Sequence, residues 1–180
     1  MYTEKLTSVK HLFEPVVDKD SRILILGSFP SVKSRENMFY YGHPQNRFWR
    51  MLADIVKADV PQTIEDKKNL ILSNGFALWD TLAMCEIHAS ADSSIRHEVP
   101  NDIPGLVKQY GIEAIMFNGN AAYRYFEKYY GKDDGLEGII KKALPSTSPA
   151  NAACSYERLV GEWGSAVNEL KEKILKEKRY

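Results

Sequence analysis

The sequence predicts an α/β fold in which helices cover both faces of a mainly parallel sheet. Two short apolar runs, residues 22–27 and 113–119, each end at a glycine. Continuous apolar runs of this kind are typical of strands that are buried on both faces. Segments in which apolar residues recur at helical spacing lie between these runs. The alternation of strand and helix indicates a parallel sheet.

The remaining elements follow from spacing and from helix-ending glycines. Two more strands are expected at 75–80 and at 141–149, the second of which runs into a loop. A helix is expected from Phe48 onward, because apolar residues recur there every three or four positions. Four further helices are predicted over residues 63–74, 104–111, 120–131 and 155–178. No linker or repeat divides the chain, so one domain is expected over residues 1–180.

Composition restricts the function classes. The 24 basic residues equal the 24 acidic ones, which argues against a protein that coats nucleic acid by bulk charge. No apolar run is long enough to span a bilayer and no secretory signal is present, so a cytoplasmic protein without a membrane partner is expected. The two cysteines, Cys85 and Cys154, have no CxxC spacing, and no HExxH occurs. Neither a metal nor a cofactor is expected.

Three loops lie where a ligand is expected. In parallel sheets, ligands bind beyond the carboxyl ends of the strands, which here correspond to residues 27–31, 118–120 and 146–151. All three loops are rich in small and polar residues, and we expect them to meet at one cleft. The first loop has no GxGxxG or GxxxxGK[ST] pattern, so a nucleotide phosphate loop is not supported.

The segment "FYYGHPQNRFW" (residues 39–49) gathers rings and hydrogen-bonding groups. Asn46 is either the N-cap of the helix that follows or a functional residue. Three consecutive aromatic residues cannot all point to one side of a helix or strand. At least one of residues 39–41 is therefore expected to face the cleft, where a ring suits stacking on a nucleobase.

Other polar residues of these loops have both a structural and a functional interpretation. Asn118 is a turn residue before Gly119, or its amide reads the edge of a base. The segment 144–151 is a turn into the last helix, or its hydroxyls and backbone N–H groups hold phosphates. Glu36 is a solvated charge or a catalytic base.

Four motifs together carry a resemblance to a known family. They are "ILGSFPSVKSRENMFYYGHPQNRFWRML", "ALWDTL", "IMFNGNAAYRYF" and "LPSTSPANA", in this order within roughly residues 22–160. The constellation resembles the uracil-DNA glycosylase superfamily, and most closely its hypoxanthine-DNA glycosylases. "HPQNRFW" is similar to the "HPANRFW" of mismatch-specific uracil glycosylases, and "LPSTS" to the "MPSSS" of thymine-DNA glycosylases.

The resemblance implies a three-layer α/β/α fold with a four-stranded sheet, and a monofunctional enzyme without cofactor or metal. The expected partner is double-stranded DNA that contains deaminated bases, bound by a monomer. The enzyme would extrude hypoxanthine, or less readily uracil, and hydrolyse its N-glycosidic bond to begin base excision repair. The alternatives are a mismatch-specific uracil-DNA glycosylase, and an inactive DNA- or nucleotide-binding module that keeps the fold.

One departure from the family pattern decides the candidate catalytic residue. Relatives have "GINPG" with a catalytic Asn, whereas "GSFPS" places Phe29 at that position. The resemblance therefore implies catalysis by Asn46, whose carbonyl would position water and stabilise positive charge on the sugar. It also implies base contacts from Ser28, Phe29, Asn118 and the ring of Tyr41. The implied DNA-binding residues are His43, Ser146, Thr147, Ser148 and Asn151. None of residues 148–151 is a strong wedge, which would favour poorly paired bases.

Overall fold

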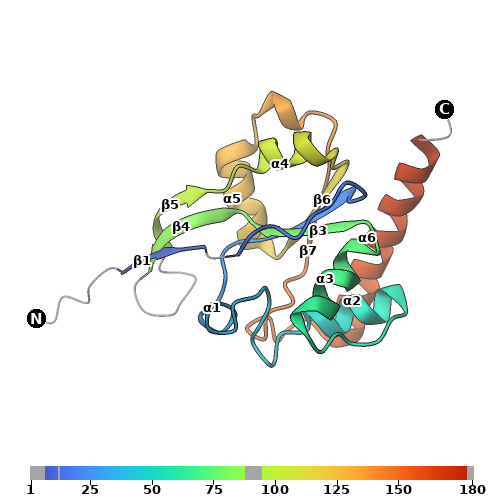
Figure 1. Cartoon of the computed structure of the whole chain (residues 1–180), viewed down its shortest axis with the longest axis horizontal. Coiled ribbons are helices and arrows are strands. Elements are labelled where there is room, and N and C mark those ends of the chain that lie inside the picture. Colours follow the sequence, from blue (N-terminus) through green and yellow to red (C-terminus); the bar gives the residue numbers. More distant parts are fainter. Residues whose placement is uncertain (1–6, 12, 88–94, 178–180) are drawn as a thin grey trace, which may run out of the picture.

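The centre of the molecule is a four-stranded sheet (Figure 1). The computed structural model describes residues 7–11, 13–87 and 95–177. All four strands are parallel, in the order β3-β2-β6-β7. Their bounds are Ile23–Gly27 for β2, Phe76–Asp80 for β3, Ala114–Asn118 for β6 and Ile140–Leu144 for β7. The four strands predicted from the sequence are confirmed.

Helices cover both faces of this sheet, as Figure 1 shows. Ile23 and Ile25 of β2 pack into the same apolar cluster as α2, α3 and α6. The intervening Leu24 and Leu26 pack into a second cluster with α4 and α5. Strand β2 is thus buried on both faces, which explains its continuous apolar run and confirms the three-layer α/β/α arrangement. The helices span Phe48–Val56 (α2), Ile64–Leu72 (α3), Ile103–Tyr110 (α4), Asn120–Tyr130 (α5) and Tyr156–Glu177 (α6).

A second sheet was not predicted. Strands β1 (Thr7–Lys10), β4 (Leu82–Ile87) and β5 (Ile95–Pro100) form an antiparallel sheet in the order β1-β4-β5. These strands mix apolar and charged residues, so they lack the glycine-bounded apolar runs that identify the central strands. Two short elements, α1 (Val32–Glu36) and a 3₁₀ turn at Asp134–Leu136, were also missed.

The register of the parallel sheet brings the predicted loops to one edge. Gly27 at the end of β2 pairs with Asp80 at the end of β3, and Asn118 of β6 pairs with Leu144 of β7. The chain segments that follow these residues therefore start side by side. Among the described helices, none combines the length and the apolar character needed to cross a membrane.

Candidate active site

A cavity of about 100 Å³ lies at this edge of the sheet. It is lined by parts of all three predicted loops and of the segment 39–49. The predicted site residues on its wall are Ser28, Phe29, Tyr41, Asn46, Asn118, Ser146, Thr147 and Ser148. The expectation that the three loops meet at one cleft is confirmed.

The amides of Asn46 and Asn118 are joined by Thr147. The Thr147 hydroxyl donates to Asn46 Oδ1 (2.9 Å) and accepts from Asn118 Nδ2 (2.9 Å). The backbone N–H of Thr147 donates to Asn118 Oδ1, also at 2.9 Å. Asn46 Oδ1 in addition accepts the N–H of Phe48 at 3.0 Å. The N-cap position of α2 is held by Arg47 and not by Asn46, so Asn46 bonds the first helical N–H from one residue before the cap.

This network fixes which way each amide points. The backbone N–H groups of Phe48 and Thr147 can only donate, so the atoms that face them must be amide oxygens. Asn46 Oδ1 then uses both of its lone pairs on protein donors. Its Nδ2 has no hydrogen bond to any residue that the structure describes, and this NH₂ group is the one left for a ligand.

Arg47, which was not singled out in the sequence, shapes the loop after β7. Its guanidinium donates to five backbone carbonyls, those of Ser146, Thr147, Ser148, Asn151 and Cys154. The planar guanidinium carries five donors in a fixed arrangement, which suits this multiple contact. Asn46 and Arg47 are neighbours in the sequence, and both bond to the loop after β7. Arg47 holds the backbone of this loop, and Thr147 of the loop holds the amide of Asn46.

Two glycines let backbone and polar groups approach closely. A Cβ on Gly27 would lie 2.1 Å from Asp80 Oδ1 and 3.1 Å from Tyr41 Oη. A Cβ on Gly119 would lie 2.9 Å from the Cβ of Ser146, and Gly119 has a φ of +92°, which side chains rarely adopt. Because neither residue has a side chain, β2 can lie close to β3, and the end of β6 can lie close to the loop after β7, around the cavity.

Of the three consecutive rings, Tyr41 is the one that is left partly exposed. Phe39 and Tyr40 are buried, whereas Tyr41 has a left-handed backbone (φ 51°) that turns its side chain to the cavity. Its ring packs on Phe48 with centroids 4.1 Å apart. Its hydroxyl is buried and has no hydrogen-bond partner among the described residues. Burial, and after it the charge of Asp80, raises the pKa of Tyr41 well above the usual value, so the hydroxyl remains a donor.

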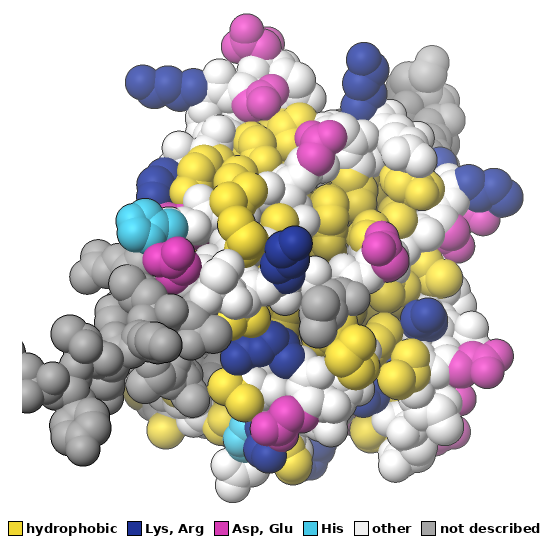
Figure 2. Space-filling view, turned by 60° about the vertical axis from the view of Figure 1, so that its left-hand side comes forward, with side chains coloured by type: hydrophobic (Ala, Val, Ile, Leu, Met, Phe, Trp, Pro, Cys, Tyr) yellow, Lys and Arg dark blue, Asp and Glu magenta, His cyan; other side chains and the backbone are white. Residues whose placement is uncertain are grey.

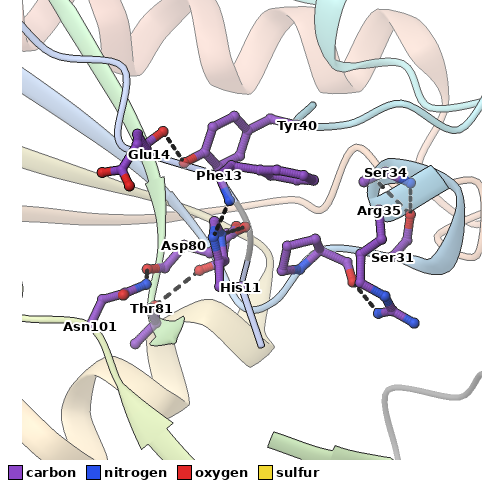
Figure 3. Close-up of polar contacts among 12 residues, drawn as sticks. His11, Phe13, Glu14, Ser31, Ser34, Arg35, Tyr40, Asp80, Thr81 and Asn101 are labelled. Atoms are coloured by element: carbon purple, nitrogen blue, oxygen red, sulfur yellow. Dashed lines mark hydrogen bonds and ion pairs between the residues drawn. The ribbon is translucent and has the colours of Figure 1, made fainter. Parts of the chain in front are cut away.

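Behind the same wall, the buried His11 pairs with Asp80 (Figure 3). His11 Nδ1 accepts the N–H of Phe13 (3.1 Å), so the ring proton is on Nε2, which donates to Asp80 Oδ2 at 2.8 Å. Asp80 is 3% exposed, and it lines the cavity. Sequence reasoning missed this pair because the two residues are 69 positions apart and His11 follows the unpredicted strand β1.

The predicted DNA-binding residues differ in accessibility. The side chain of Thr147 is fully buried in the amide network, so its hydroxyl is not available to a phosphate, contrary to the expectation. Asn151 uses its amide on the carbonyl of Ser146 and, like His43, is not on the cavity wall. Ser146 and Ser148 are half-buried on that wall. Glu36 pairs with Lys33 at the surface, away from the cavity.

Neither a surface of one charge sign nor a cluster of metal-ligating residues stands out in the views and residues described. On the face drawn in Figure 2, Lys and Arg side chains are interspersed with Asp and Glu side chains. Within the described ranges, no group of three or more His, Cys, Asp or Glu residues could hold a metal ion. The chemistry of the cavity is therefore that of amides, hydroxyls, rings and one His–Asp pair.

Comparison with known proteins defines the class. The family model of the uracil DNA glycosylase superfamily matches residues 14–176, and the chain belongs to this superfamily. The protein is thus a DNA glycosylase, an enzyme that hydrolyses N-glycosidic bonds.

The names of individual similar proteins are more specific than the name of the superfamily. A hypoxanthine DNA glycosylase of Methanosarcina acetivorans is 36% identical over 157 residues, which cover 86% of this chain and 96% of the relative. A hypoxanthine DNA glycosylase of Methanosarcina barkeri is 32% identical over 160 residues, covering 87% and 97%. The solution NMR structure of a candidate uracil DNA glycosylase from M. acetivorans superposes with a TM-score of 0.77 at 34% identity, covering 92% of this chain and 99% of the other.

Proposed function

We propose that this DNA glycosylase removes hypoxanthine from double-stranded DNA and leaves an abasic site for base excision repair. The observation that carries the proposal is the Asn46–Thr147–Asn118 network, which fixes two amides at one cavity. Two relatives that match most of the chain are named hypoxanthine DNA glycosylases. The base would enter the cavity by extrusion from the duplex.

Asn46 is the proposed catalytic residue, but its free NH₂ group, and not the carbonyl that the resemblance implies, is the part that acts. Its carbonyl oxygen already accepts hydrogen bonds from Phe48 and Thr147. The amide nitrogen can hold a water molecule by donating to its oxygen. Cleavage of glycosidic bonds passes through an oxocarbenium-like transition state. Such a centre is attacked readily, so placement of the water matters more than its deprotonation.

The remaining predicted residues are proposed as contacts. Tyr41 and the backbone of Ser28 and Phe29 would contact the extruded base, together with Asn118. Ser146 and Ser148 would approach DNA phosphates. His43 Nδ1 accepts the N–H of Gln45, which leaves Nε2–H as a donor to a phosphate.

Uracil is the second candidate substrate. The structural relative with a TM-score of 0.77 was described as a candidate uracil DNA glycosylase. Uracil and hypoxanthine both carry an adjacent N–H and C=O, so one set of contacts serves both bases.

A gel assay tests the proposal. The protein is incubated with duplexes that carry one hypoxanthine, uracil or xanthine, and abasic sites are then cleaved with alkali. We expect strand breaks with hypoxanthine first and with uracil more slowly. An intact hypoxanthine strand after prolonged incubation would refute the proposed substrate.

Two variants test the role of Asn46. Asn46→Ala should lower the single-turnover rate about 100-fold or more, as expected for loss of a positioned group. Asn46→Asp keeps the oxygen that faces Phe48 and Thr147 but replaces the NH₂ group, so it should be equally impaired. Wild-type rates in Asn46→Asp would mean that an acceptor, not a donor, serves catalysis.

A further inference from the structure

Tyr41 and Asp80 place a donor and an acceptor side by side on the cavity wall. Gly27 has room for both, because its missing Cβ would lie 3.1 Å from Tyr41 Oη and 2.1 Å from Asp80 Oδ1. The Tyr41 hydroxyl is buried without a partner in the described part of the chain. A buried polar group left in this state costs about 1–3 kcal/mol, which a ligand that fills the cavity can offset.

The His11 contact decides which oxygen of Asp80 is free. His11 donates from Nε2 to Oδ2, and the Phe13 N–H holds His11 in the tautomer that can do so. Oδ1 has no hydrogen bond to any described residue and is the atom closest to Gly27. The free atoms are therefore one hydroxyl donor and one carboxylate acceptor.

Asn118, the residue predicted to read the base, is already engaged. One of its donors and one lone pair of its oxygen are bonded to Thr147. One face of the Tyr41 ring is likewise covered by Phe48. Beside Gly27, the hydroxyl of Tyr41 and Oδ1 of Asp80 are the two polar atoms that have no hydrogen bond to a described residue.

We propose that Tyr41 and Asp80 read the lactam edge of the extruded base, with His11 as the positioning residue. The Tyr41 hydroxyl donates to C6=O of hypoxanthine, and Asp80 Oδ1 accepts from N1–H. Adenine has an acceptor at N1 and a donor at C6, so the same pair meets it with both polarities reversed. Uracil offers the same pattern at N3–H and C4=O. The pair rejects adenine and cytosine, the parent bases of hypoxanthine and uracil, whereas guanine and thymine carry the same lactam edge and must be excluded by other contacts. The inference rests on the proposed function.

The test compares two bases of the same ring shape. Purine (the base of nebularine) lacks both C6=O and N1–H. Duplexes with either base opposite thymine, made resistant to cleavage by a 2′-fluoro sugar, give dissociation constants that do not depend on catalysis. We expect the wild-type protein to favour hypoxanthine about 10- to 100-fold over purine, the size of a good paired contact.

Two conservative variants should lower this preference. Tyr41→Phe keeps the ring and loses the hydroxyl, so it should lower the hypoxanthine-to-purine ratio and leave the part that comes from Asp80. In Asp80→Asn, His11 Nε2–H requires the amide oxygen, so the NH₂ group faces the base and opposes N1–H. This variant should bring the ratio to within about threefold of unity. Tyr123→Phe on α5 and Asp59→Asn at the surface are matched controls and should keep the wild-type ratio.

The outcomes separate this inference from the proposed function. A variant that weakens both duplexes equally, or that keeps the wild-type ratio, overturns the Tyr41–Asp80 assignment. A wild-type protein without any preference also overturns it. Retained binding preference without excision of hypoxanthine would refute the proposed activity while supporting the assignment.

Discussion

The two ends of the Asn46 amide differ, because its oxygen accepts from Phe48 and Thr147 while its nitrogen has no partner among the described residues. The sequence offered capping and function as alternatives, and the structure places Arg47 at the N-cap of α2, with Asn46 one residue before it. The two bonds to its oxygen hold the side chain in one orientation, which is what a positioning group requires. Thr147 also fixes the orientation of the Asn118 amide through two hydrogen bonds.

Thr147→Val should therefore lower activity more than its stability cost explains. Valine keeps the shape but leaves the amides of Asn46 and Asn118 without their shared hydroxyl. We expect a loss of about 1–3 kcal/mol in unfolding free energy and at least a tenfold lower single-turnover rate at saturating enzyme.

The matched control is Ser21→Ala, which removes a buried hydroxyl bond to Phe76 at the opposite end of β2. It should destabilise the fold by a similar amount in urea titrations and leave the rate per folded molecule unchanged. Equal rates in both variants would contradict a positioning role for Thr147.

At the scale of elements, the loop between β7 and α6 contains turns but no helix or strand. It is fixed by the Arg47 guanidinium and by Trp163 of α6, whose indole N–H donates to the carbonyl of Pro145. These bonds replace the regular backbone pairing that a strand or helix would provide.

Arg47→Lys should loosen this loop. Lysine keeps the charge but cannot contact five carbonyls with one ammonium group. We expect faster amide hydrogen exchange across residues 145–154 and a rate of base excision lowered at least tenfold. Arg50→Lys, one turn further along α2 and stacked on Tyr156, is the control and should alter neither. Unchanged exchange in Arg47→Lys would show that other contacts hold the loop.

Most of the central sheet was predictable because β2, β3 and β6 are largely apolar runs, and α4 and α5 because each ends at a glycine. Asn46, Asn118 and Tyr41 were predicted to meet at one cleft because they lie in the loops that follow or flank such strands, and the structure places all three on the cavity wall. The antiparallel sheet, His11 and Asp80 were not predicted, since β1, β4 and β5 mix apolar and polar residues without a clear pattern and the pair joins residues 69 positions apart. Arg47 was missed because its partners are backbone carbonyls, which any sequence has.

At the scale of the whole molecule, the buried Tyr40 and the half-buried Tyr41, whose hydroxyl is buried, couple stability to pH. Burial, and secondarily the charge of Asp80, raises the pKa values of Tyr40 and Tyr41 above the ordinary tyrosine value of about 10. The unfolded chain releases these protons from about pH 10 upward, whereas the folded chain keeps them. Their contribution to stability is therefore complete below about pH 10 and is lost as the pH rises further.

Urea titrations between about pH 8 and pH 11 should show the unfolding free energy falling above about pH 10. Tyr41→Phe should make this fall shallower, because one of the two groups no longer titrates. Tyr123→Phe serves as the control for a tyrosine on the opposite face of the sheet. The same steepness in wild type and Tyr41→Phe would exclude the coupling.

The bond between Thr147 and Asn46 joins residues 101 positions apart. During synthesis, Asn46 and Arg47 leave the ribosome long before their hydrogen-bond partners do. These partners are the Thr147 hydroxyl and the backbone carbonyls of the loop after β7. An unfinished chain that has reached only α5 has three of the four parallel strands, but it has neither Thr147 nor the loop that Arg47 binds. We therefore expect a nascent or prematurely terminated chain of this length to lack the assembled cavity and to excise no base.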